Sequence, residues 1–135
     1  MKKDSTKFRR FITSSGKLVL AGKSAEQNEN VIKQAGKEEI IIHTREAGSP
    51  FCNIKETAEK EDIREAAVFC ARYSRDWKLN QKDVEVHIFK GKDIYKSKEM
   101  KTGTFGVNKF KPITVKKGEI IKFIEVESKG GEKEK

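Results

Sequence analysis

Hydrophobic residues recur along this chain with two spacings, one typical of strands and one typical of helices. Strict alternation is clearest over residues 83–89, where Val84, Val86 and Ile88 share one face. Helical spacing is clearest over residues 63–73. The pattern predicts strands at 8–12, 17–21, 39–44, 51–54, 83–89, 94–97, 105–108, 111–116 and 119–126, and helices at 25–35 and 63–75.

Turn and capping residues separate these segments. Ser14-Ser15-Gly16 predicts a hairpin turn, and Ser24 predicts a helix N-cap with Gln27 completing a capping box. Three consecutive isoleucines, 40–42, suit a strand buried on both faces. The order of elements predicts a two-layer α+β domain in which two helices pack on one face of a mixed β-sheet. This single domain is expected to span residues 1–127, followed by a disordered tail at 128–135 that is rich in Gly, Glu and Lys.

Composition restricts the class of protein. The 135 residues fit one domain, and no apolar run reaches the length of a membrane span, so no membrane partner is expected. The first residues lack the apolar stretch of a secretory signal, which predicts a cytoplasmic protein. Cys52 and Cys70 lie 18 residues apart without a histidine at ligand spacing. Neither a metal nor a cofactor is expected, and reduced thiols are favoured over a disulfide.

Positive charge is concentrated in two segments. Residues 1–23 carry a net charge of +6 and residues 90–117 a net charge of +7, whereas residues 24–89 carry −3. Two basic segments indicate a shared positive face suited to nucleic acid, although solvated surface lysines remain the alternative.

Catalytic signatures are lacking. Ser49 lies in Gly-Ser-Pro rather than in a nucleophile elbow, and the glycines at 103 and 106 do not match a phosphate-binding loop. His43 closes the central strand beside Arg45, where it is either structural or placed to bond a phosphate or a base. The sequence therefore favours a protein that is not an enzyme, with an RNA-modifying or RNA-cleaving enzyme that uses His43 as general base as the remaining alternative.

Aromatic residues are interleaved with cations in the segments 7–11 and 105–111, both of which are expected to alternate faces, and cations also surround Trp77. In the segment 7–11, outward-pointing basic side chains could contact phosphates while the phenylalanines enter the core. Trp77, just past the second helix, has Arg72, Arg75 and Lys78 around it. The indole either stacks on an unpaired base or covers the core.

Four strings, taken in order, resemble a known family. KFRRFITSSGKLVLAGKSAEQNE (7–29), IIIHTREAGSP (40–50), IREAAVFCARYSRDWK (63–78) and YKSKEMKTGTFGV (95–107) are similar to the NFACT-R domain. That resemblance implies a stand-alone copy of an RNA-binding module without an activity of its own. Larger members act in ribosome-associated quality control, so the implied partners are tRNA or ribosomal RNA, with the large ribosomal subunit or a rescue factor. Arg10 stands where many members have Trp, and Lys23 where many have Arg.

Together these observations predict a non-catalytic RNA-binding module, with a protein-interaction adaptor on the ribosome as the alternative. Phosphate contacts would supply most of the affinity, and a pocket would select an unstacked nucleotide. The predicted RNA-binding face comprises Lys7, Arg9, Arg10, Lys17, Lys23, Lys96, Lys98 and Lys101 around a pocket rimmed by Gln27, Asn28, His43 and Arg45, with Arg72, Arg75, Trp77 and Lys78 as its boundary.

Overall fold

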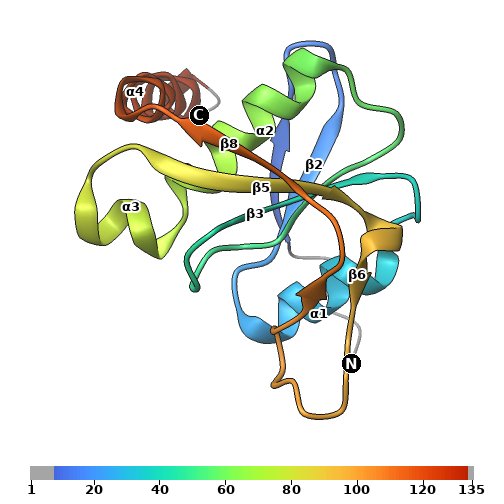
Figure 1. Cartoon of the computed structure of the whole chain (residues 1–135). Helices are drawn as coiled ribbons and strands as arrows, with labels where there is room; N and C mark the ends of the chain where they lie inside the picture. Colours follow the sequence, from blue (N-terminus) through green and yellow to red (C-terminus); the bar gives the residue numbers. More distant parts are fainter. Residues whose placement is uncertain (1–7, 134–135) are drawn as a thin grey trace.

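The backbone of residues 8–133 is described by a computed structural model, and it has the predicted α+β fold. Within those residues six strands form one sheet, two short strands form a second, and four α-helices surround them (Figure 1). The strands are β1 (Arg9–Ile12), β2 (Leu18–Ala21), β3 (Ile40–Thr44), β4 (Cys52–Ile54), β5 (Val84–Lys90), β6 (Ile94–Tyr95), β7 (Gly106–Val107) and β8 (Lys111–Val115). The helices are α1 (Ala25–Gln34), α2 (Lys60–Arg72), α3 (Arg75–Asn80) and α4 (Lys117–Lys133), with a short 3-10 turn, η2, at Gly91–Asp93.

The main sheet has the strand order β1-β2-β4-β3-β5-β8, and each neighbouring pair is antiparallel. The expected mixed sheet is therefore wrong in this detail. A parallel pair needs a long crossover between its strands, whereas a short turn suffices to join β1 to β2 and β3 to β4 antiparallel. The predicted hairpin at the start of the chain is confirmed by the pairing of β1 with β2.

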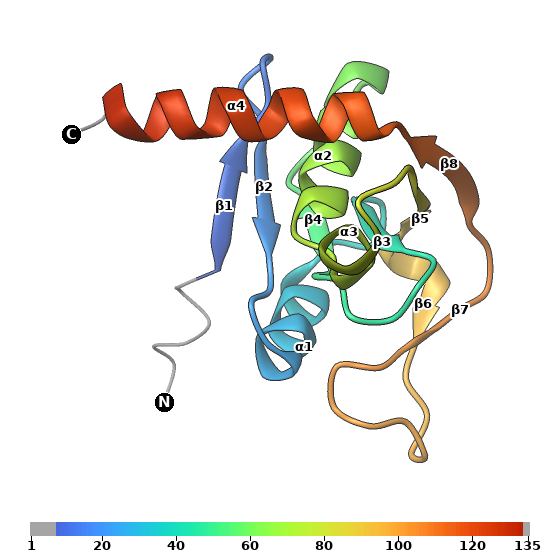
Figure 2. The same cartoon turned by 90° about the vertical axis from the view of Figure 1, so that its left-hand side faces the viewer.

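Helices cover both faces of the sheet, rather than two helices covering one face. α2 and α4 pack on the face that carries Val19 and Ile42, while Val31 of α1 packs on the opposite face, against Leu20 and Ile41 (Figure 2). Consecutive strand residues point to opposite faces, so a strand with adjacent buried isoleucines needs apolar cover on each side. The central strand β3 receives that cover from α1 and α2.

The last segment is a helix, and the strand predicted at 119–126 is wrong. Ile120 is buried, and Phe123 and Ile124 pack against the same core cluster, at the spacing of one helical face. An ion pair between Arg64 and Glu119 joins this helix to α2. Helix α4 continues to Lys133, so most of the segment expected to be a disordered tail is helical, and residues 134–135 lie outside the described part.

The single helix predicted at 63–75 is two helices. α2 ends at Arg72, and α3 begins after Ser74, whose side chain accepts a hydrogen bond from the backbone N–H of Trp77. This cap redirects the chain so that Trp77 enters the core, where it is 4% exposed. Cys52 and Cys70 are buried free thiols, as expected. In the part of the chain described, no helix combines the length and the apolar character that a membrane crossing requires.

The tip of the β1–β2 hairpin is fixed to the start of α2. Asp62 accepts hydrogen bonds from the hydroxyls of Thr13 (2.8 Å) and Ser15 (2.6 Å), and these bonds help to lower its pKa. Lys17 lies at this end of the hairpin. Ten residues separate Asp62 from Arg72 along α2, which is about 15 Å of helix.

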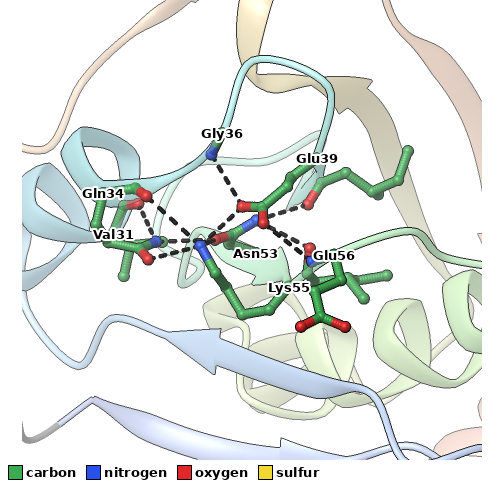
Figure 3. A network of polar contacts seen from close by, with 9 residues as sticks. Val31, Gln34, Gly36, Glu39, Asn53, Lys55 and Glu56 are labelled. Carbon is green, nitrogen blue, oxygen red and sulfur yellow. Dashed lines mark hydrogen bonds and ion pairs between the residues drawn. The ribbon is translucent and has the colours of Figure 1, made fainter.

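A polar network joins the C-terminal end of α1 to β3 and β4 (Figure 3). The buried Asn53 accepts from the side chain of Gln34 (2.8 Å) and donates to the carbonyl of Ile40 (3.2 Å). Lys55 donates to Glu39 at 2.8 Å and to Asn53 at 3.2 Å. Each polar group of Asn53 thus has a partner, as a buried amide requires.

Candidate nucleic-acid interface

A groove of about 690 Å³ opens where the start of α1 meets the turn between β3 and β4. A third wall is the loop that connects β6 to β7, which hangs beside α1 in Figure 2. The lining residues are Arg9, Gly22, Lys23, Ser24, Ala25, Asn28, His43, Thr44, Arg45, Ala47, Gly48, Ser49, Pro50, Phe51, Arg72, Tyr73, Lys78, His87, Phe89, Gly103, Thr104, Phe105 and Val107.

The turn between β3 and β4 is held in a fixed shape. Gly48 has a φ of +93°, a left-handed conformation that favours glycine, and a Cβ at this position would lie 2.9 Å from Arg75. Its carbonyl accepts from the backbone N–H of Arg75 at 3.0 Å. The hydroxyl of Ser49 accepts from the N–H of Thr44 at 3.1 Å. The first of these bonds attaches the turn to the beginning of α3, and the second closes the turn on the end of β3.

Asn28 connects the α1 wall to the turn. Its Oδ1 accepts from the backbone N–H of Phe51 at 3.0 Å, and a Cβ on Gly22 would lie 2.2 Å from that same oxygen. Any residue larger than glycine at position 22 would displace the amide. The capping role of Ser24 is confirmed, since its side chain accepts from the N–H of Gln27 at 3.1 Å.

Lys96 fastens the third wall to α1. Its ammonium group lies 2.7 Å from the carboxylate of Glu29 and also donates to the carbonyls of Lys101 and Thr104. The same carboxylate accepts from the N–H of Gly103 at 2.7 Å. Burial opposes the charge on Glu29, but these hydrogen bonds outweigh it and lower the pKa. Lys96 therefore organises the loop, and its contact with a phosphate stays a prediction.

Aromatic rings form the floor of the groove. The rings of His43 and Phe51 stack with their centroids 4.1 Å apart, and Phe105 meets Phe51 edge to face at 5.3 Å. Burial of the imidazole lowers the pKa of His43 to about 4. His43 is therefore neutral at pH 7 and a weak base, which argues against the general-base role considered from the sequence.

At one side of the groove, two arginines flank the ring of Tyr73. The guanidinium of Arg9 lies 3.9 Å from the ring centroid and that of Arg72 lies 4.5 Å from it. Arg72 also pairs with Glu127 of α4 at 2.9 Å, and the hydroxyl of Tyr73 donates to the same carboxylate. Helix α4 thus orients Arg72 and Tyr73 at this side.

The remaining cations of the groove are exposed. Lys23 and Lys78 lie in the open part of the lining, and Arg45 is 3.9 Å from Glu85 with 63% of its side chain exposed. A surface pair at that distance contributes little stability and exchanges readily for a phosphate. Five basic side chains surround an aromatic floor with few carboxylates among them, an arrangement that attracts an anion bearing flat rings.

The structure brings together seven of the predicted site residues and leaves the others outside the groove. Those lining it are Arg9, Lys23, Asn28, His43, Arg45, Arg72 and Lys78. Those outside it are Arg10, Lys17, Gln27, Arg75, Trp77, Lys96, Lys98 and Lys101, while Lys7 lies outside the described residues.

Each of these separations has a physical reason. Arg10 points to the opposite face of β1 from Arg9 because strand residues alternate. Gln27 is buried and accepts from the backbone N–H of Lys23 at 2.9 Å, so it shapes the start of α1 from inside. Lys17 is at the far end of the hairpin. Trp77 is in the core, which leaves its ring faces no room for a base.

Arg75, Lys98 and Lys101 are exposed beside the groove rather than in it. Sequence reasoning also missed several aromatic residues of the lining. Phe51, Phe105, Tyr73 and His87 line the groove and were not among the predicted site residues. For His87 the sequence does give a signal, because Glu85 and His87 alternate with the apolar residues of their strand and so share its other face.

Comparison with known proteins identifies the family of this chain. Residues 7–109 match the family model described as the NFACT protein RNA binding domain. The chain is 35% identical over 99 residues to the archaeal Rqc2 homolog aRqcH of Methanocaldococcus jannaschii, which covers 67% of this chain but 15% of that relative. The resemblance therefore concerns a small part of the larger protein.

A solved structure has the same fold. The C-terminal part of the fibronectin/fibrinogen-binding protein from Streptococcus suis superposes with a TM-score of 0.74 at 23% identity, covering 82% of this chain and 45% of that one. At this identity the likeness establishes the fold alone. Because the family model covers most of the sequence, including the residues that build the groove, the chain belongs to the NFACT family of RNA-binding domains.

Proposed function

We propose that this chain binds structured RNA, either tRNA or ribosomal RNA, through the groove between α1 and the β3–β4 turn. The observation that carries this proposal is the set of cations around the rings of His43 and Phe51. In this proposal Arg9 and Lys23 contact backbone phosphates, and the half-buried ring of His43, which is supported from below by the buried Phe51, meets an unpaired base. RNA of this kind offers both phosphates and loops with unstacked bases.

The partners proposed are those of translation in the cytoplasm, with the large ribosomal subunit or a rescue factor presenting the RNA. The archaeal relative is named as an Rqc2 homolog, which supports a role connected to ribosome-associated quality control. The proposed role is binding without catalysis, since the imidazole nearest the floor has a pKa of about 4 and is a poor proton acceptor for chemistry near neutral pH.

A salt titration of RNA binding tests the groove. Replacing Arg9 and Lys23 together with Gln removes two phosphate contacts, so the slope of log affinity against log salt should become shallower by about 2, with at least a tenfold loss of affinity at moderate salt. Binding of fluorescent tRNA and of a ribosomal RNA fragment is measured by anisotropy.

The matched control replaces two exposed lysines away from the groove, Lys37 and Lys60, with Gln. It makes the same change in net charge and should leave the slope close to that of the unaltered protein. Equal slopes for the two double variants, in proteins with unchanged melting temperature, would refute the groove as the RNA site. DNA of the same sequence shows whether the 2′-hydroxyl contributes.

A further inference from the structure

The sheet face that carries His43 is open to solvent over β5 and β8. Cross-strand partners share a face, so His87 and Pro112 lie on the same side as His43, and so do Glu85 and Thr114. α1 covers the other end of this face, and Pro112 and Thr114 are exposed. Part of one sheet face, next to the groove, is thus left for a ligand.

Phe110 lies on this open part with 47% of its surface exposed. Its ring stacks on that of His87, with centroids 4.0 Å apart and an angle of 15° between the planes. The imidazole of His87 is fixed by the carboxylate of Glu85 at 3.0 Å. One face of the phenyl ring is therefore held against a fixed partner.

The Phe110–His87 pair continues the floor of the groove. His87 is the cross-strand partner of His43, which stacks on Phe51. Directly opposed residues have Cβ atoms about 5 Å apart, so the rings of β3 and β5 are neighbours. A row of rings runs from Phe105 in the groove to Phe110 at its exposed end.

We propose that the Phe110–His87 pair is a stacking site for one unpaired base of the RNA strand that leaves the groove. This inference rests on the proposed function. Aromatic side chains on a sheet face hold successive bases of single strands with little regard to sequence, because every base has a flat face. The exposed Lys109 precedes Phe110 and is placed near the adjoining phosphate.

The surroundings of Phe110 favour RNA over an apolar protein surface. Asn108, Lys109 and Lys111 are near it in sequence and are exposed, so polar residues flank the exposed ring on both sides along the chain. A protein partner would need a contiguous apolar patch at the centre of its contact. Phe110 also lies just beyond the residues that the family model matches.

Tryptophan fluorescence gives a direct test. The chain has one tryptophan, Trp77, which is buried in the core, so Phe110→Trp adds one exposed indole. A short single-stranded RNA of mixed sequence should quench this added fluorescence at the same concentrations at which it binds. The same RNA as a full duplex, whose bases are already paired, should quench it much less. Absence of quenching by the bound single strand would overturn the proposal.

Phe110→Leu removes the ring and keeps an apolar side chain, and it should weaken binding of the single strand about tenfold. The control is Val126→Ala on α4, a change of another exposed apolar residue, 61% exposed, which should leave affinity unchanged. Equal affinity for Phe110→Leu and the unaltered protein would count against the stacking site alone, provided that Arg9→Gln with Lys23→Gln still weakens binding. If neither change affects RNA binding, the groove and the stacking site both fail.

Discussion

The two ends of helix α1 are both polar, and they differ in how their charges are paired. At the C-terminal end, Lys55 lies 2.8 Å from Glu39 and bonds two amide side chains as well. At the N-terminal end, Lys23 and Lys78 are in no ion pair among the described residues. Partnered and enclosed polar groups stabilise one arrangement of the chain, whereas exposed cations without carboxylates favour binding an anion.

The two ends of α1 are therefore expected to differ in what they contribute, one to folding stability and the other to RNA affinity. Groups at the C-terminal end of α1 should contribute to folding and leave RNA binding unchanged. Groups at the N-terminal end should do the reverse, because their partners are supplied by the ligand. Two asparagines, Asn53 and Asn28, allow the same substitution at each end.

Asn53→Ala is expected to have the largest effect. The change removes four hydrogen bonds at a buried site, two of them from Gln34 and Lys55, so the free energy of unfolding should fall by about 3 kcal/mol. Urea denaturation measures this loss. The RNA affinity of the fraction that remains folded should match that of the unaltered protein, and a large loss of affinity would break the distinction between the two ends.

Acid titration of Glu39 gives the next effect. Burial opposes its charge, but hydrogen bonds from the N–H of Gly36, from Lys55 and from the N–H of Glu56 outweigh it and lower the pKa from 4.5 to about 2. A lowered carboxyl pKa gives stability that is present above pH 4.5 and is lost as the pH falls toward 2, here about 2–3 kcal/mol. The difference in unfolding free energy between the unaltered protein and Glu39→Gln should shrink over that interval. A constant difference would contradict the pairing.

His43 should titrate in a different interval. Its pKa is lowered from 6.5 to about 4, so the unfolded chain takes up a proton before the folded one does. Stability from this group is present above pH 6.5 and is lost as the pH falls toward 4, by about 2–3 kcal/mol. His43→Gln should remove this part of the acid response while leaving that of Glu39. An unaltered profile between pH 6.5 and 4 would mean that the imidazole is accessible to protons.

Asn28→Ala is expected to have the smallest effect on stability and a measurable effect on binding. Asn28 accepts one hydrogen bond, from the N–H of Phe51, so its loss should cost about 1 kcal/mol. RNA affinity should fall several-fold because the ring floor loses its tie to α1. Anisotropy and urea denaturation on the same samples separate the two effects, and a fall in stability without a fall in affinity would place Asn28 with Asn53.

Elements defined by local signals could be predicted from the sequence. The hairpin, the capped start of α1 and the strands around Ile41 and Val86 follow from alternation and from capping residues. Helix α4 could not be predicted, because its apolar residues fit the spacing of a strand as well as that of a helix. These residues are Ile120, Ile121, Phe123 and Ile124. The segment is helical because its apolar face packs against α2, which is distant in sequence.

The candidate site was predictable in its cations more than in its rings. Arg9, Lys23 and Arg45 follow from charge, from alternation and from the resemblance to a family. The floor is different, because Phe51, Phe105 and His87 come from separate segments that the sheet register brings together. For Trp77 the cations nearby were equally compatible with a core position. The helix cap at Ser74 accepts from the N–H of Trp77, and the indole lies in the core.

The open sheet leaves two strand edges, β1 and β8, with backbone groups that another chain could pair with. Pro112, the second residue of β8, has no backbone N–H to donate, and Lys111 adds an exposed charge beside it. The other edge strand, β1, is only four residues long and carries the charges of Arg9 and Arg10. Both edges therefore resist pairing with a second copy, so a sheet with an exposed aromatic face can be concentrated on an RNA scaffold without nucleating aggregates.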